Sequence, residues 1–197
     1  MKRRQFRRPS GQRRYRRLFF VAAEGRNTEP SYFAILNDQQ STVHVKCLKG
    51  GKDSAPIYVL KRLDDYLKEE RLKPTDEAWL VVDKNHWPDE QLHILYTWST
   101  KKPNYGFAVS NPKFEYWLLL HFEDGDNVAD SRDCSARLRR YLPDSDKSIC
   151  TRNITSSMID DAVRRARQRD NPSCSDWPRT TGTTMYKLVQ NIRRPAN

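Results

Sequence analysis

The stretch LFFVAA at residues 18–23, followed directly by Glu24 and Gly25, decides the fold class of this chain. It is a short apolar run of strand-forming residues, which is typical of a strand that is buried on both faces. Thr28 and Pro30 follow, and a capping residue with a proline just after it favours the start of a helix. A buried strand that leads straight into a helix is the beginning of an α/β unit.

The same alternation continues along the next hundred residues. Further strands are predicted at VHVKCL (43–48), AWLVV (78–82) and YGFAVS (105–110), and amphipathic helices at 54–71, at 88–98 and from Asn111-Pro112 onward. Strands that alternate with helices form parallel sheets whose faces are covered by those helices. The predicted fold class is therefore α/β, with a mostly parallel central sheet flanked by helices.

The last third of the chain has a different pattern. From about residue 130 it reads as wholly helical, with helices predicted at 134–141, 156–169 and 183–194. A chain of 197 residues fits one domain with a tail. We therefore expect a basic, flexible arm at 1–17 and a single domain at 18–197, in which an α/β core (18–122) precedes a mainly helical part (123–197).

The positive charge of the chain is concentrated in the arm. Residues 2–17 contain nine lysines and arginines and no acid, out of a net charge of +11 for the whole chain. A concentrated positive segment attracts polyanions by releasing their counterions, whereas a solvated tail with no specific role is the alternative. The candidate nucleic-acid contacts in the arm are Arg3, Arg4, Arg7, Arg8, Arg13, Arg14, Arg16 and Arg17.

Composition excludes several other classes of protein. The mean hydropathy is −0.91, and no apolar run approaches the roughly 18–20 residues that span a bilayer. No apolar segment follows the basic start, so a secretory signal is not expected. The four cysteines have irregular spacing and no CxxC pair, which favours a reducing compartment over a disulfide framework. We expect a cytoplasmic protein without membrane contacts.

Polar residues follow three of the predicted strands at the point where each strand ends. Glu24 ends the first strand and Glu29 lies one loop later; Asp83 and Asn85 follow AWLVV; Glu115 lies one turn into the helix after YGFAVS. In open α/β sheets, ligands bind outside the carboxyl ends of the strands. Carboxylate and amide oxygens suit Mg²⁺ or Mn²⁺. Glu24, Asp83, Asn85 and Glu115 are therefore the candidate metal ligands.

Each of these residues also has a purely structural interpretation. Glu29 would complement a helix N-terminus, Asp83 would cap the next helix or accept loop amides, and Glu115 would be an exposed helix residue. His86 is a candidate base or phosphate contact, or else an ordinary loop histidine. Lys52 lies in GGKDS, which is not a P-loop because the G-x-x-x-x-G-K-[ST] spacing is missing. It remains a candidate phosphate contact. The convergence of acids after apolar strands favours the functional interpretation.

Three segments in order resemble the RloB family. They are EGRNTEPSYF (24–33), VVDKN (81–85) and SNPKFEYWLLLHF (110–122), and the tail from Asn171-Pro172 through residues 180–188 is similar to the family's C-terminal region. The resemblance covers most of residues 18–193. It implies a Toprim-like core and an association with bacterial anti-phage and abortive-infection defence. It also implies an ABC-type or AAA ATPase partner.

Toprim nucleases and topoisomerases hold Mg²⁺ with a glutamate after the first strand and an Asp-x-Asp after a later one. Carried over, the glutamate is Glu24, with Glu29 as a second acid, and the Asp-x-Asp falls on Asp83-Lys84-Asn85. The second acid of that motif is thus an asparagine here. An amide oxygen ligates Mg²⁺ but brings no charge, so we expect weaker metal binding unless Glu115 or Glu29 supplies the missing carboxylate.

The leading hypothesis is a metal-dependent phosphodiesterase, a nuclease that hydrolyses DNA or RNA, with a tRNA among the candidate substrates. Catalytic roles are predicted for Glu24, Glu29, Asp83, Asn85 and His86, while Lys52, Lys84 or His86 would stabilise negative charge in the transition state. The alternative is a non-catalytic nucleic-acid-binding or regulatory subunit of a defence complex, which Asn85 motivates. A toxin held inactive by its ATPase partner is a third interpretation, and the sequence leaves a homo-oligomer open.

Overall fold

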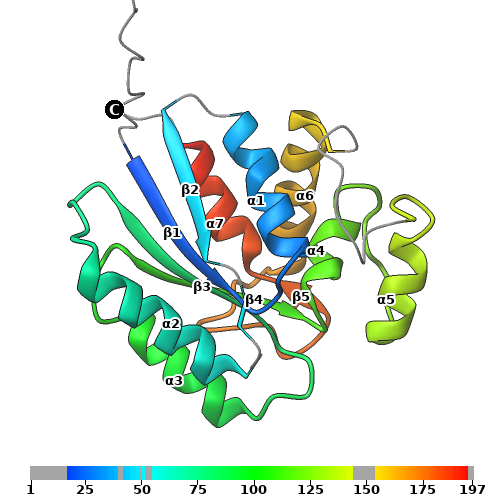
Figure 1. The fold of residues 1–197 in the computed structure, drawn as a ribbon. Helices are drawn as coiled ribbons and strands as arrows, with labels where there is room; N and C mark the ends of the chain where they lie inside the picture. Colours follow the sequence, from blue (N-terminus) through cyan, green and yellow to red (C-terminus); the bar gives the residue numbers. More distant parts are fainter. Residues whose placement is uncertain (1–16, 40–41, 49, 52–54, 144–153, 195–197) are drawn as a thin grey trace, which may run out of the picture.

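The computed structural model describes residues 17–39, 42–48, 50–51, 55–143 and 154–194. Its centre is a five-stranded sheet of order β2-β1-β3-β4-β5 (Figure 1). The first four strands are parallel and β5 is antiparallel to β4. The strands are β1 (Arg17–Ala23), β2 (Val43–Leu48), β3 (Glu77–Asp83), β4 (Tyr105–Asn111) and β5 (Gly182–Thr183).

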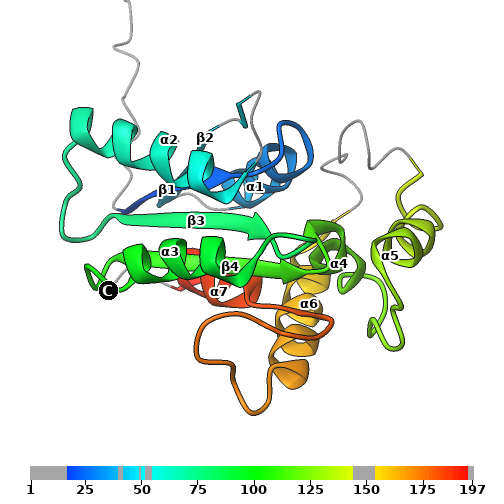
Figure 2. The same ribbon diagram turned by 90° about the horizontal axis from the view of Figure 1, so that it is seen from below.

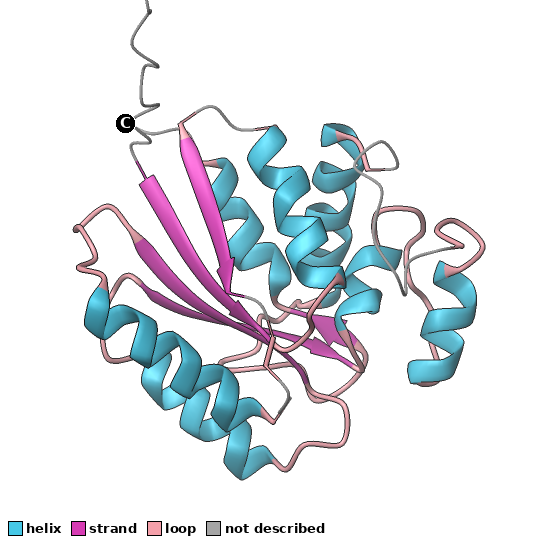
Figure 3. Ribbon diagram, in the orientation of Figure 1, coloured by secondary structure: helices cyan, strands magenta, loops and turns pink. Residues whose placement is uncertain are grey.

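Helices cover both faces of this sheet (Figure 3). Those on one face are α2 (Pro56–Glu69) and α3 (Asp89–Ser99). The other helices lie on the opposite face, where α5 packs against α4: α1 (Thr28–Asp38), α4 (Phe114–Leu119), α5 (Ser131–Leu138), α6 (Ser156–Arg169) and α7 (Met185–Arg193). Figure 2 shows the strands one after another from β2 to β4, with α6 beyond β4. The predicted α/β class and the helical C-terminal part are confirmed.

The alternation of side chains along β1 explains why its sequence is continuously apolar. Phe19, Val21 and Ala23 belong to the core under α1, α4, α6 and α7. Phe20 and Ala22 belong to the core under α2 and α3. Successive strand residues point to opposite faces, so a strand with helices on both sides needs apolar residues at every position.

Two predictions about the C-terminal part are wrong in detail. Residues from about 130 onward were expected to be wholly helical, yet Gly182 and Thr183 form β5 and pair with Asn111 and Ser110. Two residues are too few to produce a periodic pattern, and the pairing depends on a strand far away in sequence. The helix expected at 134–141 is α5, which begins earlier because the Asp130 carboxylate accepts hydrogen bonds at its start.

The start of α1 also differs from the expected capping arrangement. Thr28 is the first residue of α1 rather than its cap, and Asn27 before it makes no capping hydrogen bond with its side chain. Pro30 lies in the first turn, as predicted. None of the helices in the described ranges is long and apolar enough to cross a membrane.

The point where the strand order reverses lies between β1 and β3. These neighbours are parallel, but the chain leaves β1 for β2 through α1 on one face and leaves β3 for β4 through α3 on the other. The two connections therefore separate at the carboxyl ends of β1 and β3. Such a topological switch point is where open α/β sheets bind their ligands.

Glu77 fastens the opposite end of the sheet. Its carboxylate accepts hydrogen bonds from the Arg17 guanidinium at 2.7 Å, the Trp79 indole at 2.9 Å and the Asn191 amide at 3.1 Å. Arg17 also donates to the backbone oxygens of Asn191 and Arg194. Arg17 is thus the first residue of β1 and not the last residue of the arm.

Replacing Glu77 by alanine is expected to lower the free energy of unfolding by about 2 kcal/mol, because three partly buried donors lose their acceptor. Urea denaturation measures this change. Glu90→Gln on the exposed start of α3 is the matched control and should stay within about 0.5 kcal/mol of the parent. Equal stabilities of Glu77→Ala and the control would show that the contacts of Glu77 do not hold these elements together.

Candidate metal centre

Glu24 and Asp83 meet at the carboxyl ends of β1 and β3. The backbone amide of Glu24 donates to the Val81 oxygen at 3.2 Å, and the Glu24 Oε2 accepts from the backbone amide of Asp83, also at 3.2 Å. The parallel register of the two strands therefore brings these acids to one edge. Residues that are far apart in the sequence become neighbours because both strands end at the same level.

Asp83 is partly buried at the end of β3 and is fixed there by the start of α4. Its Oδ1 accepts a hydrogen bond from the Phe114 amide at 2.8 Å. Burial raises the pKa of Asp83 well above its usual range, and the charges of Glu29, Glu24 and Glu115 raise it further. The carboxylate thus accepts the first amide of α4, rather than a loop amide or an amide of α3, the helix that follows β3, and the charges of three other acids act on it.

Glu29 is the most deeply buried of these acids, with 5% of its surface exposed. Its Oε1 accepts a hydrogen bond from the Gly25 amide at 3.1 Å. Burial raises the pKa of Glu29 to about 7, against the opposing effect of backbone hydrogen bonds and with help from the charges of Glu115 and Glu24. A side chain at Gly25 would place its Cβ only 2.0 Å from the Glu29 Oε2. Glycine is therefore required for this close approach.

Glu24 faces the loop that follows β3. Its Oε1 accepts from the Trp87 indole at 3.4 Å. Burial raises the pKa of Glu24, while the hydrogen bonds from Asp83 and Trp87 and the charge of His86 partly offset that effect. Glu24 therefore lies between the buried acids and the exposed loop.

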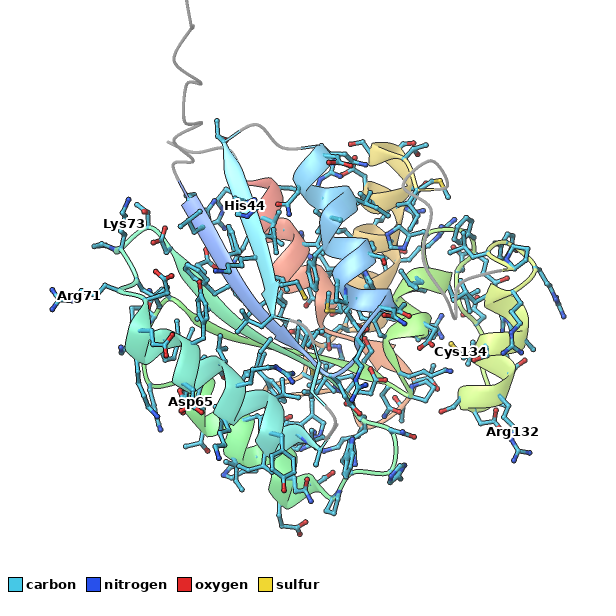
Figure 4. The ribbon with its side chains drawn as sticks, viewed as in Figure 1. His44, Asp65, Arg71, Lys73, Arg132 and Cys134 are labelled. Carbon is cyan, nitrogen blue, oxygen red and sulfur yellow. The ribbon has the colours of Figure 1, made fainter. Side chains whose placement is uncertain are left out.

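Glu115 completes a group of four carboxylates, which we call the acidic cluster: Glu24, Glu29, Asp83 and Glu115. Glu115 is partly buried and pairs with Lys113 at 3.5 Å. Its charge acts on both Glu29 and Asp83. Cys134 of α5, labelled in Figure 4, is buried. Burial raises its pKa to about 12, with further contributions from Glu115 and Asp83.

Asn85 lies two residues after Asp83, in the loop that follows β3. It is exposed, and its backbone amide donates to the Pro112 oxygen at 2.9 Å. Its φ of 36° lies in the left-handed region, where asparagine is tolerated better than most residues. The backbone therefore gives an independent reason for an asparagine at this position.

The other polar residues of this loop lie closer to solvent. His86 is exposed, with its ring 5.1 Å from that of Trp87. The Lys84 ammonium donates to the Trp87 oxygen at 2.6 Å and pairs with Asp89 at 3.0 Å. Lys84 is thus already engaged within its own loop. Lys52 and the arm residues Arg3, Arg4, Arg7, Arg8, Arg13, Arg14 and Arg16 lie outside the described residues.

Arg62 of α2 is a cation near this edge that the sequence did not indicate. It donates to the Ala23 oxygen at 2.6 Å, so it reaches the carboxyl end of β1. Its buried Nε has no hydrogen-bond partner among the residues that the structure describes. An arginine among the many charges of an amphipathic helix gives no local signal of such a contact, since the contact depends on how α2 packs on the sheet.

The donor set of the acidic cluster has the right chemistry for a hard divalent cation. Mg²⁺ and Mn²⁺ prefer carboxylate oxygens, and the mutual repulsion that raises the pKa of Asp83 would be relieved by a cation. Within the described ranges, however, no three histidine, cysteine, aspartate or glutamate side chains already stand in a metal-binding arrangement. Holding a cation therefore requires the carboxylates to turn toward one another.

Comparison with known proteins assigns the chain to a family. Residues 19–192 match the family model described as RloB-like protein. No curated protein and no solved structure matches the chain. The matched range contains all of the acidic cluster and every element of the sheet except the first two residues of β1. The chain belongs to the RloB-like protein family, as its sequence motifs predicted.

Proposed function

We propose that this protein is a Toprim-like, metal-dependent nuclease. The observation that carries the proposal is the acidic cluster at the topological switch point of the sheet, where four carboxylates surround the ends of β1 and β3. The family resemblance adds the setting: an effector of bacterial anti-phage defence in the cytoplasm that works with an ATPase partner. The substrate class is DNA or RNA, including tRNA.

The residues have distinct roles in this proposal. Asp83 and Glu24 would hold Mg²⁺ or Mn²⁺, and Glu115 would supply the further carboxylate in place of the charge that Asn85 lacks. A bound cation of this kind polarises the scissile phosphate and lowers the pKa of an attacking water. Glu29, with a pKa of about 7, exchanges a proton readily at neutral pH and serves as the general acid or base.

The cations near the edge would bind the substrate's phosphates. His86 is exposed next to Glu24, and Arg62 reaches the end of β1 from the other side. In this proposal the Arg62 guanidinium would offset the negative charge that develops on the phosphate in the transition state, and the His86 ring would contribute a hydrogen bond to it. Lys52 and the arginines of the arm would hold the backbone without reading its sequence.

The second candidate function is a non-catalytic, nucleic-acid-binding subunit of the same kind of complex. Asn85 favours it, because the position has no carboxylate and its side chain is exposed beside the acidic cluster. Such a protein would bind nucleic acid with a steep salt dependence. It would show no turnover with any divalent cation.

Calorimetric titration with Mn²⁺ and Mg²⁺ tests the proposal on the parent chain, Asp83→Ala and Asn85→Asp. We expect binding by the parent, loss of binding in Asp83→Ala, and about tenfold tighter Mn²⁺ binding in Asn85→Asp, because a carboxylate adds a charge to the donor set. Asn127→Asp is the matched control, since Asn127 is also exposed with a positive φ of 55°.

The outcomes separate the candidate functions. Binding that Asp83→Ala abolishes supports the nuclease and calls for cleavage assays on DNA and RNA. Binding only by Asn85→Asp favours the non-catalytic subunit. If no variant binds either metal, the acidic cluster is structural and the proposed nuclease is wrong.

A further inference from the structure

A groove lies between α6 and α7, on the helical face of the molecule. Two adjoining hollows of about 620 Å³ and 800 Å³ share six lining residues, so they form one continuous depression. A depression of this volume has room for a ligand that is made of several linked chemical groups. The shared lining residues are Asp160, Val163, Arg167, Ser173, Tyr186 and Gln190.

Two arginines in this groove have free guanidinium groups. Arg167 and Arg194 are exposed, and no hydrogen bond or ion pair of their side chains is found among the residues that the structure describes. Two other arginines of the groove are already paired. Arg164 binds Asp161 at 3.1 Å and Arg193 binds Asp160 at 3.0 Å. The groove therefore offers unsatisfied positive charge held next to fixed ion pairs.

The remaining acid of the groove is also occupied. The Asp170 carboxylate accepts hydrogen bonds from the Tyr186 hydroxyl and the Cys174 amide, both at 2.8 Å, and lies 3.7 Å from the Lys187 ammonium. The carboxylate oxygens of Asp170 are therefore already engaged by these groups and are not available to a hydrogen-bond donor on a ligand. The Ser173 hydroxyl also donates to Asp170, at 3.2 Å. What the groove presents to a ligand is two guanidinium groups together with uncharged polar side chains from Asn171 and Gln190.

Guanidinium forks match the geometry of phosphate oxygens better than any other side chain. The groove follows α7. This helix has nine residues, so it is about 13 Å long at 1.5 Å per residue. That length corresponds to several phosphates of one strand, which are spaced about 3.4 Å apart along a duplex. A polyphosphate chain thus fits both the charge and the extent of the groove.

The arm joins the body at one end of this groove. Arg17 donates hydrogen bonds to the backbone oxygens of Asn191 and Arg194, so the chain before Arg17 departs next to the end of α7. The sixteen residues before Arg17 contain eight lysines and arginines. Arg17, the last residue of this basic run, therefore lies at the end of α7 that borders the groove.

We propose that the α6–α7 groove binds the sugar–phosphate backbone of a nucleic acid at a distance from the acidic cluster. The inference rests on the proposed function only in taking nucleic acid as the substrate. The groove runs from the start of α7, beside β5, toward Arg17 at the amino end of β1. It would guide the strand along the body while the acidic cluster acts on it at the carboxyl ends of β1 and β3.

Fluorescence anisotropy with a labelled duplex of about 20 base pairs tests this proposal, since phosphate contacts make binding depend on salt. The buffer contains EDTA, so neither metal binding nor cleavage contributes. The double variant Arg167→Gln, Arg194→Gln should bind at least about tenfold more weakly at moderate salt. Its slope of log K against log salt should fall by about 1.8, because each duplex phosphate contact contributes about 0.9.

The double variant Arg71→Gln, Arg132→Gln is the matched control. Both arginines are exposed; Figure 4 labels Arg71 beyond the end of α2 and Arg132 on α5, and neither residue lines the groove. Equal losses in the two double variants would mean a general charge effect and would overturn the proposal, as would unchanged binding by the groove variant. Melting temperatures equal to the parent's confirm that each variant is folded.

The outcome is independent of the nuclease proposal. Weakened binding of the groove variant supports the groove even if calorimetry finds no metal binding, in which case only the nuclease is wrong. Metal binding together with unchanged nucleic-acid affinity of the groove variant removes the groove and leaves the nuclease intact.

Discussion

Asp83→Asn is expected to reduce metal-dependent cleavage by at least about 10³-fold, the size of effect seen when a principal electrostatic group is removed from an active site. Asp83 is the acid on which the other three members of the acidic cluster act. It therefore lies where a cation would be bound most strongly. An amide keeps the shape of the side chain but removes the charge that, in the proposed nuclease, would hold the cation and orient the phosphate.

The same substitution should leave the metal-free fold at least as stable as the parent. Asparagine retains an oxygen that accepts the hydrogen bond from the Phe114 amide, which Asp83 accepts at 2.8 Å. It also removes one charge from a group of mutually repelling carboxylates. Groups placed for function commonly reduce stability, so a gain in stability with loss of activity is the signature of a functional acid.

Cleavage assays in Mn²⁺ and thermal unfolding in EDTA together measure the two effects. Asp65→Asn is the control, because Asp65 is exposed on α2 (Figure 4) and pairs with Lys68 at the surface. Full activity in Asp83→Asn would rule out a role for Asp83 in binding the cation. Destabilisation of Asp83→Asn in EDTA would instead show that the charge of Asp83 supports the fold.

The sequence was sufficient to predict which edge of the sheet carries the acidic cluster, because that prediction needs only the strand ends and their parallel arrangement. Apolar strands end at identifiable residues, and parallel strands bring their carboxyl ends together. Glu24 and Asp83 could therefore be paired without any knowledge of side-chain positions. Their electrostatic coupling to Glu115 follows from the hydrogen bond that fixes the start of α4 to β3.

The features that the sequence did not indicate depend on contacts between distant segments. Arg62 reaches the Ala23 oxygen only because α2 packs across the end of β1. β5 exists because Gly182 and Thr183 lie beside the edge of β4. The exposed position of Asn85 depends on its positive φ, which its neighbours in sequence do not dictate. None of these contacts produces a periodic signal in the chain.

The second large effect concerns pH and the buried carboxyl of Glu29. Its pKa rises from an ordinary value of 4.5 to about 7, mainly because burial disfavours the charged form. Between these two pH values the folded protein keeps a proton that the unfolded chain has released. The folded state binds more protons throughout this window, so the free energy of unfolding must fall as the pH rises.

The expected loss is about 3 kcal/mol between pH 4.5 and pH 7, since each unit of pKa difference corresponds to about 1.36 kcal/mol. The cost of the buried charge is absent below pH 4.5 and fully present above pH 7. The pKa values of Glu24 and Asp83 are raised in the same direction. These two acids therefore make the free energy of unfolding fall more steeply with pH than Glu29 alone would.

Urea denaturation in EDTA at several pH values between 5 and 8, on the parent and on Glu29→Gln, isolates the contribution of Glu29. Glutamine cannot ionise, so the variant should lose less stability across this range and should exceed the parent at pH 8. Saturating Mn²⁺ should reverse the slope of the parent, because a cation bound to ionised carboxylates stabilises the folded state most at high pH. Parallel pH profiles of the two proteins in EDTA would mean that Glu29 is already ionised in the folded protein. A slope that Mn²⁺ leaves unchanged would mean that the carboxylates hold no cation, so this single series of measurements tests both the burial of Glu29 and the metal site.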